Sequence, residues 1–115
     1  MIIDPGQWKK VQELMAEFAF PATEESTSYG TPAYKVGKKL LLRLREDGES
    51  LVIHADDRDI WLDDDPVVFF VTEHYYKYPY VLVRLKKIRK PKLRQLIRQS
   101  WIELAGARLR EKWEG

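Results

Sequence analysis

The sequence predicts an α+β fold of two layers, in which helices pack on one face of a five-stranded antiparallel sheet. Apolar residues recur at helical spacing near both ends of the chain, and strand-like alternation fills the middle. An Asp47-Gly48 pair between two of these strands is typical of a tight antiparallel hairpin. The expected order is helix, three strands, helix, two strands, helix, in one domain over residues 1–115.

The first helix is predicted to begin at Pro5, with Asp4 as its N-cap. The Phe20-Pro21 pair ends it, because the residue before a proline is driven out of the helical conformation. The polar residues 23–28 are expected to form a connection. The apolar face of this helix consists of Trp8, Val11, Leu14, Met15 and Phe18.

Three strands are expected next, over residues 31–36, 39–45 and 51–55, because apolar and polar residues alternate there. Residues 56–65 then predict a short helix that is capped by aspartate and ends at the Asp65-Pro66 pair. This helix is expected to carry Ile60, Trp61 and Leu62 inward.

Two more strands are predicted over residues 67–72 and 78–87, joined by a link rich in aromatic residues. Pro91 opens the last helix, which Gly106 is expected to kink or split. The buried stripe of this helix is Leu93, Leu96, Ile97, Ser100, Trp101, Leu104, Ala105 and Leu109.

Composition excludes several classes of function. The chain has no cysteine, so disulfides, thiol catalysis and thiolate metal sites are ruled out, and a reducing cytoplasm is the expected location. No apolar run approaches the roughly 18 residues that would span a bilayer, so no membrane partner is expected.

Catalysis and metal binding are not expected from the residue patterns. His54 and His74 are the two histidines, and neither lies beside a glycine-flanked serine or another known nucleophile. The consecutive residues Asp63, Asp64 and Asp65 point in different directions on a helix and cannot converge on one cation. We therefore expect a non-enzymatic protein with no metal or cofactor.

Basic residues are distributed unevenly and give the main indication of a partner. From Arg84 to Arg98 eight cationic residues follow one another with no acidic residue between them. The predicted strands place Lys39, Arg43 and Arg45 on one face, and a neighbouring face carries Arg84 and Lys86. The hypothesis of DNA or RNA binding assigns phosphate contacts and stacking to Lys39, Arg43, Arg45, Arg84, Lys86, Lys87, Arg89, Lys90, Arg94, Tyr76, Tyr78 and Tyr80.

Other interpretations of these residues stay open. The basic segment can be a solvated strand end followed by the outer face of a helix. An exposed sheet face with tyrosine and arginine can also bind a protein partner or act as a chaperone-like module. A third alternative is a small anionic ligand near the His74 loop. The sequence does not determine the oligomeric state or choose between DNA and RNA.

Four segments resemble the MmcQ/YjbR-like family of small bacterial proteins: Ser28-Tyr-Gly-Thr-Pro-Ala-Tyr-Lys-Val-Gly37, Leu42-Arg-Leu-Arg-Glu-Asp-Gly48, Phe69-Phe-Val-Thr-Glu-His-Tyr and Tyr78-Pro-Tyr-Val-Leu-Val-Arg-Leu85. The resemblance implies the same element order, in a fold likened to type III secretion chaperones and to a double-wing DNA-binding arrangement. It also implies a DNA-binding label that rests on structural likeness. Glu73 and Lys77 depart from the family pattern, where proline and glycine are common. The signature positions carried over are Thr31, Pro32, His74, Tyr75, Tyr78, Pro79 and Arg84, none with a catalytic role.

Overall fold

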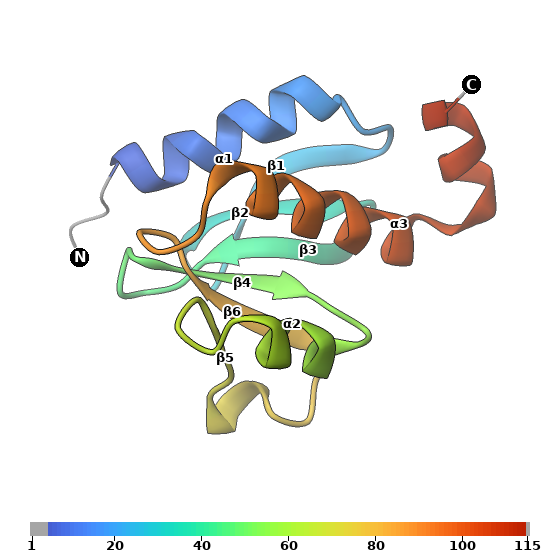
Figure 1. Ribbon diagram of the computed structural model, residues 1–115. Coiled ribbons are helices and arrows are strands. Elements are labelled where there is room, and N and C mark those ends of the chain that lie inside the picture. Colours follow the sequence, from blue (N-terminus) through green and yellow to red (C-terminus); the bar gives the residue numbers. More distant parts are fainter. Residues whose placement is uncertain (1–4, 115) are drawn as a thin grey trace.

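The computed structural model describes residues 5–114, which form three α-helices, a short 3-10 helix and one antiparallel sheet (Figure 1). The predicted N-cap Asp4 lies outside the described residues. The elements in chain order are α1 (Pro5–Phe18), β1 (Thr23–Ser28), β2 (Thr31–Val36), β3 (Lys39–Leu44), β4 (Ser50–His54), α2 (Arg58–Asp64), β5 (Phe69–Phe70), η1 (Glu73–Tyr75), β6 (Tyr80–Arg84) and α3 (Lys90–Glu114).

The sheet has six strands in the order β1-β2-β3-β4-β6-β5, and every neighbouring pair is antiparallel. The prediction of five strands was wrong because residues 23–28, expected as a connection, form β1 and pair with β2 along their whole length. This edge strand leaves its polar side chains exposed or half-buried, so it shows no apolar alternation. Backbone hydrogen bonds to β2 keep β1 in the sheet without an apolar face.

All three α-helices contribute to one apolar cluster on the same face of the sheet, which confirms the predicted two-layer arrangement (Figure 1). Trp8 of α1, Trp61 of α2 and Trp101 of α3 are buried in this cluster. The sheet supplies residues of alternate strand positions, including Leu51 and Ile53 of β4.

The helix α3 is interrupted at Gly106, as the sequence predicted. The backbone angles there are φ 75° and ψ 167°, a conformation that residues with a Cβ atom rarely adopt. The red C-terminal part of α3 turns away from the rest of the helix in Figure 1. It brings Trp113 onto Phe20 and Trp101, with ring centroids 5.1 and 5.4 Å apart.

The predicted hairpin at Asp47-Gly48 joins β3 to β4. Gly48 has a φ of 72°, and the Asp47 carboxylate accepts hydrogen bonds from the backbone N–H groups of Glu49 and Ser50, both at 2.9 Å. Burial alone would raise the pKa of the Asp47 carboxyl, but these hydrogen bonds outweigh it and lower the pKa.

Three details of α2 and the segment after it differ from the predictions. Trp61 packs inward against Phe69, but Ile60 is 60% exposed, because a helix of seven residues at the edge of the sheet buries only a narrow stripe. Asp57 holds the N-cap position without a side-chain capping bond. The strand predicted over residues 67–72 is reduced to the two residues of β5, and the aromatic link after it contains η1.

Candidate nucleic-acid interface

The face of the sheet opposite the α-helices is only partly covered. Strand register places Arg43, Val52 and Leu82 next to one another across β3, β4 and β6 on this face. Of the helices in the described part of the chain, only η1 adds a buried residue, Tyr75, to the small cluster formed there. The rest of this face is available to a ligand.

Arg43 lies at the centre of the open face and is almost fully buried, with 3% of its surface exposed. Its Nε donates a hydrogen bond to the hydroxyl of Tyr75 at 3.1 Å. Its Nη1 donates to Thr31 Oγ1 at 3.2 Å and to Glu46 Oε1 at 3.0 Å. The guanidinium also lies 5.1 Å from the centre of the Tyr29 ring. Arg43 therefore organises the floor of this face and is not the exposed cation that the sequence suggested.

The Arg43–Glu46 pair is held in its charged state. Burial alone would lower the pKa of the Arg43 guanidinium, but hydrogen bonds to Tyr75 and Glu46 outweigh burial and raise the pKa. Burial would raise the pKa of the Glu46 carboxyl, but a backbone hydrogen bond and the one from Arg43 lower it. Burial, with the nearby Tyr75 and Tyr29, raises the pKa of the Tyr80 phenol, which stays neutral.

The loop around η1 is fixed by Arg58 of α2. The Arg58 guanidinium donates hydrogen bonds to the backbone carbonyls of Tyr75 at 3.1 Å, Tyr76 at 2.9 Å and Tyr78 at 3.0 Å. It also lies over the Tyr76 ring, 5.4 Å from its centre. The ring of Tyr78 is left 56% exposed beside the open face.

Three adjoining hollows cross the open face, with volumes of about 380, 280 and 340 Å³. The first two share Tyr29, His74 and Tyr75, and the last two share Arg45, so their lining is continuous. We call this lining the tyrosine–arginine groove. It is defined by seven cationic side chains, Lys35, Lys38, Arg43, Arg45, Arg84, Lys86 and Lys87, and six aromatic ones, Tyr29, Phe70, His74, Tyr75, Tyr78 and Tyr80.

Three carboxylates also line the groove, and each is paired with a cation. Besides the Arg43–Glu46 pair, Arg45 lies 3.4 Å from Asp47 and Lys86 lies 3.6 Å from Glu49. Within residues 5–114, the groove cations that form no ion pair are Lys35, Lys38, Arg84 and Lys87. The groove therefore carries an excess of positive charge.

Seven of the twelve residues assigned to nucleic-acid binding line the groove, and they come from β3, β6 and the loops next to them. These seven are Arg43, Arg45, Tyr78, Tyr80, Arg84, Lys86 and Lys87. Lys39 does not share a face with Arg43, so that prediction was wrong. A bulge leaves Leu41 without a partner on β2 and pairs Lys39 with Val36, whose side chain is in the core on the other side.

The other four assigned residues lie outside the groove. Arg94 forms an ion pair with Glu17 and covers the ring of Phe18, so it joins α3 to α1. Arg89 and Lys90 are exposed near the start of α3. Tyr76 has Arg58 over its ring but is 66% exposed, and it lines a separate hollow beside the η1 loop.

The sequence did not point to Tyr29, Lys35 and Lys38 as groove residues. Tyr29 has a φ of 52° in the Tyr29-Gly30 turn between β1 and β2, and its ring is 78% exposed. A two-residue loop ending in glycine is a usual hairpin signal, and it was missed because β1 was not expected.

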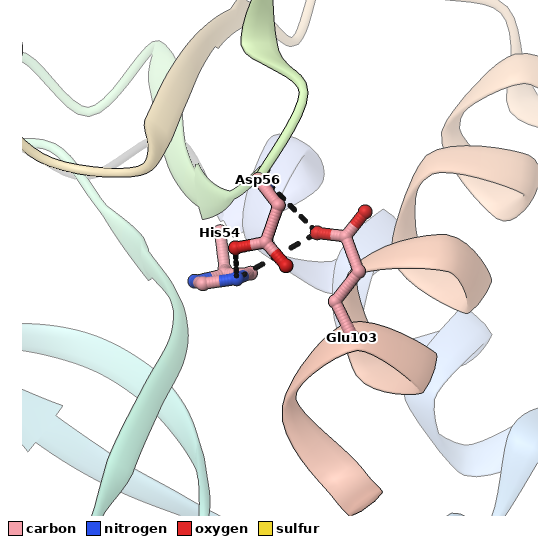
Figure 2. A group of neighbouring side chains, drawn as sticks. All are labelled: His54, Asp56 and Glu103. Carbon is pink, nitrogen blue, oxygen red and sulfur yellow. Dashed lines mark hydrogen bonds and ion pairs between the residues drawn. The ribbon is translucent and has the colours of Figure 1, made fainter.

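A group of possible metal ligands lies outside the groove, within the part of the chain that the structure describes. Figure 2 shows His54 and Asp56, at and just after the end of β4, facing Glu103 of α3. Their candidate ligand atoms all lie within 4.8 Å of one another. Local sequence patterns do not indicate this group, because Glu103 is far from the other two residues in the chain.

The fold and the groove define a small α+β protein whose antiparallel sheet carries helices on one face and cationic and aromatic side chains on the other. A model of the YjbR family matches residues 18–102, and the chain belongs to this family. Two curated relatives are the uncharacterized protein Rv2570 of Mycobacterium tuberculosis and the uncharacterized protein Mb2600 of Mycobacterium bovis. Each is 27% identical to this chain, over 91% of this chain and 77% of the relative.

The fold is shared with a solved structure. The crystal structure of the Deinococcus radiodurans protein DR2400, with its DUF419 domain, matches with a TM-score of 0.69 over 90% of this chain and 87% of that one. The two are 18% identical, so this likeness concerns the fold alone. Among residues 5–114, no helix combines the length and the apolar character needed to cross a membrane.

Proposed function

We propose that the protein binds single-stranded nucleic acid along the tyrosine–arginine groove and acts by binding, without catalysis. The observation that carries this proposal is the continuity of the groove. The groove brings together four cationic side chains and two strongly exposed tyrosine residues. None of these four cations has a carboxylate partner within the described residues. A cytoplasmic location is part of the same proposal and rests on the cysteine-free composition.

The proposed mechanism combines phosphate contacts with base stacking. Lys35 and Lys38 lie at one end of the groove and Arg84 and Lys87 at the other, so an extended phosphate backbone can contact both ends. The exposed rings of Tyr29 and Tyr78 offer stacking surfaces between or beside these cations. Stacking favours a single strand, because bases in a duplex are already stacked on one another.

Two alternatives are less well supported by the contacts. A small anion near His74 would need free donors on Arg43, but these are occupied by Tyr75, Thr31 and Glu46. A protein partner on the open face would be centred on the aromatic residues and would respond weakly to salt. Nucleic-acid binding is expected to weaken steeply as salt increases.

The direct test is fluorescence anisotropy of labelled single-stranded and duplex oligonucleotides at several salt concentrations. Each phosphate contact with a single strand contributes about −0.7 to the slope of log K against log salt concentration. Four unpaired cations therefore predict a slope of about −3, with the single strand bound more tightly than the duplex. Absence of binding at low salt would refute the proposal and direct the search to a protein partner.

Charge-reversal variants locate the binding surface. Lys38→Glu combined with Lys87→Glu is expected to weaken binding at least about 10-fold, because each removes a phosphate contact and adds repulsion. Lys9→Glu combined with Arg110→Glu is the matched control, since both residues are exposed, lie on helices and do not line the groove. An equal loss in both double variants would show that net charge, and not the groove, governs binding.

A further inference from the structure

The cluster of His54, Asp56 and Glu103 brings one imidazole nitrogen and two carboxylates together (Figure 2). His54 Nε2 lies 2.8 Å from Asp56 Oδ1 and 3.6 Å from Glu103 Oε1. The side chains of His54 and Glu103 are 9% and 14% exposed, whereas that of Asp56 is 61% exposed. None of the three lines the tyrosine–arginine groove, so this inference is independent of the proposed function.

Neighbouring groups hold the Glu103 carboxylate and the backbone of His54 in place. The Glu103 carboxylate accepts hydrogen bonds from the Asp56 backbone N–H at 2.9 Å and from Gln99 Nε2 at 3.1 Å. Ser100 Oγ donates to the backbone carbonyl of His54 at 2.6 Å, which attaches the end of β4 to α3. Such outer contacts orient metal ligands in known sites.

The positions of the His54 nitrogen and the two carboxylates fit a bound metal ion better than a single hydrogen-bonded proton. A single proton on His54 Nε2 can form one good hydrogen bond, but this nitrogen faces carboxylate oxygens on both Asp56 and Glu103. Ligand atoms around a tetrahedral Zn²⁺ with bonds of about 2.0–2.1 Å are roughly 3.3 Å apart. The two separations from His54 Nε2, 2.8 and 3.6 Å, lie on either side of this value, and all three candidate ligand atoms lie within 4.8 Å of one another.

We infer that His54, Asp56 and Glu103 form a binding site for a first-row divalent metal ion of the Zn²⁺ type. One imidazole with two carboxylates is a ligand set that such ions accept, whereas Mg²⁺ and Ca²⁺ prefer oxygen ligands alone. Water can complete the coordination, because Asp56 lines a hollow of about 250 Å³ beside the η1 loop and Glu103 lines a cleft of about 490 Å³ between α2 and α3. The bound ion would connect β4 to α3.

The test is a titration of the whole chain with ZnCl₂, followed by calorimetry and by thermal unfolding. We expect one equivalent of Zn²⁺ to bind and to raise the midpoint of unfolding. Co²⁺ in place of Zn²⁺ is expected to give ligand-field absorption bands from the same stoichiometric site. His54→Gln and Glu103→Gln should each weaken Zn²⁺ binding at least about 100-fold, since loss of even an outer-shell contact costs about 10–100-fold.

His74→Gln provides a matched control, because His74 is the second histidine of the chain and is not in the cluster. This variant is expected to keep wild-type Zn²⁺ affinity within about twofold. If His54→Gln fails to fold, Glu103→Gln decides the question, because its amide oxygen still accepts the Asp56 N–H. The inference is overturned if the wild type binds no Zn²⁺ or if Glu103→Gln binds it as tightly as the wild type.

Discussion

Arg43 shows how a single buried charge is tolerated in the sheet. Its guanidinium has hydrogen-bond partners on three different segments: Thr31 of β2, Glu46 of the following hairpin and Tyr75 of η1. A buried charge is costly unless it is paired and hydrogen-bonded, and here both conditions are met. Arg43 therefore links β2, the hairpin after β3 and η1 in the middle of the groove.

Replacement of Arg43 by methionine tests this role. We expect Arg43→Met to lower the free energy of unfolding by about 2–3 kcal/mol, because Tyr75 loses the partner of its hydroxyl. Tyr75→Phe alone should cost about 1 kcal/mol. The double variant should cost less than the sum of the two single variants, and urea unfolding measures all three. Strictly additive losses would contradict the coupling.

Sequence patterns located several groove residues without showing how each is used. Strand alternation correctly placed Arg43 on the face opposite Leu42 and Leu44, but it did not reveal burial, because Tyr75 covers Arg43 from a segment far along the chain. The bulge at Leu41 moved Lys39 to the other face, and a bulge leaves little trace in a short apolar strand. Local sequence patterns do not predict contacts between segments that are far apart in the chain.

Among the elements, α2 and η1 act together although neither is long. Arg58, the first residue of α2, donates hydrogen bonds to the backbone carbonyls of Tyr75, Tyr76 and Tyr78 and so fixes the position of Tyr78 beside the groove. The loop also has its own backbone hydrogen bonds, from Tyr75 N to Thr72 O at 3.0 Å and from Tyr78 N to Tyr75 O at 3.0 Å. The geometry of this loop thus depends on one side chain from another element.

We expect Arg58→Ala to loosen the η1 loop while the sheet stays folded. Hydrogen exchange at the amides of Tyr75 and Tyr78 should become about 10-fold faster, because the loop loses several hydrogen bonds that oppose its opening. Lys77→Ala removes an exposed cation from the same loop and is the control. Exchange that is unchanged in Arg58→Ala, or equally faster in both variants, would show that Arg58 does not hold the loop.

Elements with a strong periodic pattern were predicted well, and those without one were not. The helices α1 and α3 and the strand β4 carry regular apolar positions that match their buried faces, and in β3 the match holds only after the bulge at Leu41. β1 is an edge strand with polar side chains, so its pairing comes from backbone bonds that no residue pattern records. β5 was shortened because the chain turns into η1 directly afterwards.

At the scale of the whole molecule, the fold separates the basic segment of residues 84–98 into two parts. Lys86 and Lys87 follow β6 and line the groove, whereas Lys92 and Arg94 lie on α3 and pair with acidic residues of α2 and α1. Two cations of this segment without a carboxylate partner among residues 5–114, Arg84 and Lys87, thus share the open face with Lys35 and Lys38, which are remote in sequence. The separation of helices and groove onto opposite faces of the sheet is the basis of the proposed function.

The most direct test of this account is nuclear magnetic resonance of the ¹⁵N-labelled protein titrated with oligothymidylate at low salt. The proposal predicts that the largest amide shift changes fall along the tyrosine–arginine groove, at Tyr29, Lys35, Tyr78 and Arg84, and diminish as salt is added. Changes confined to α1 and α3, or no changes at saturating oligonucleotide, would contradict the assignment of the open sheet face as the binding surface.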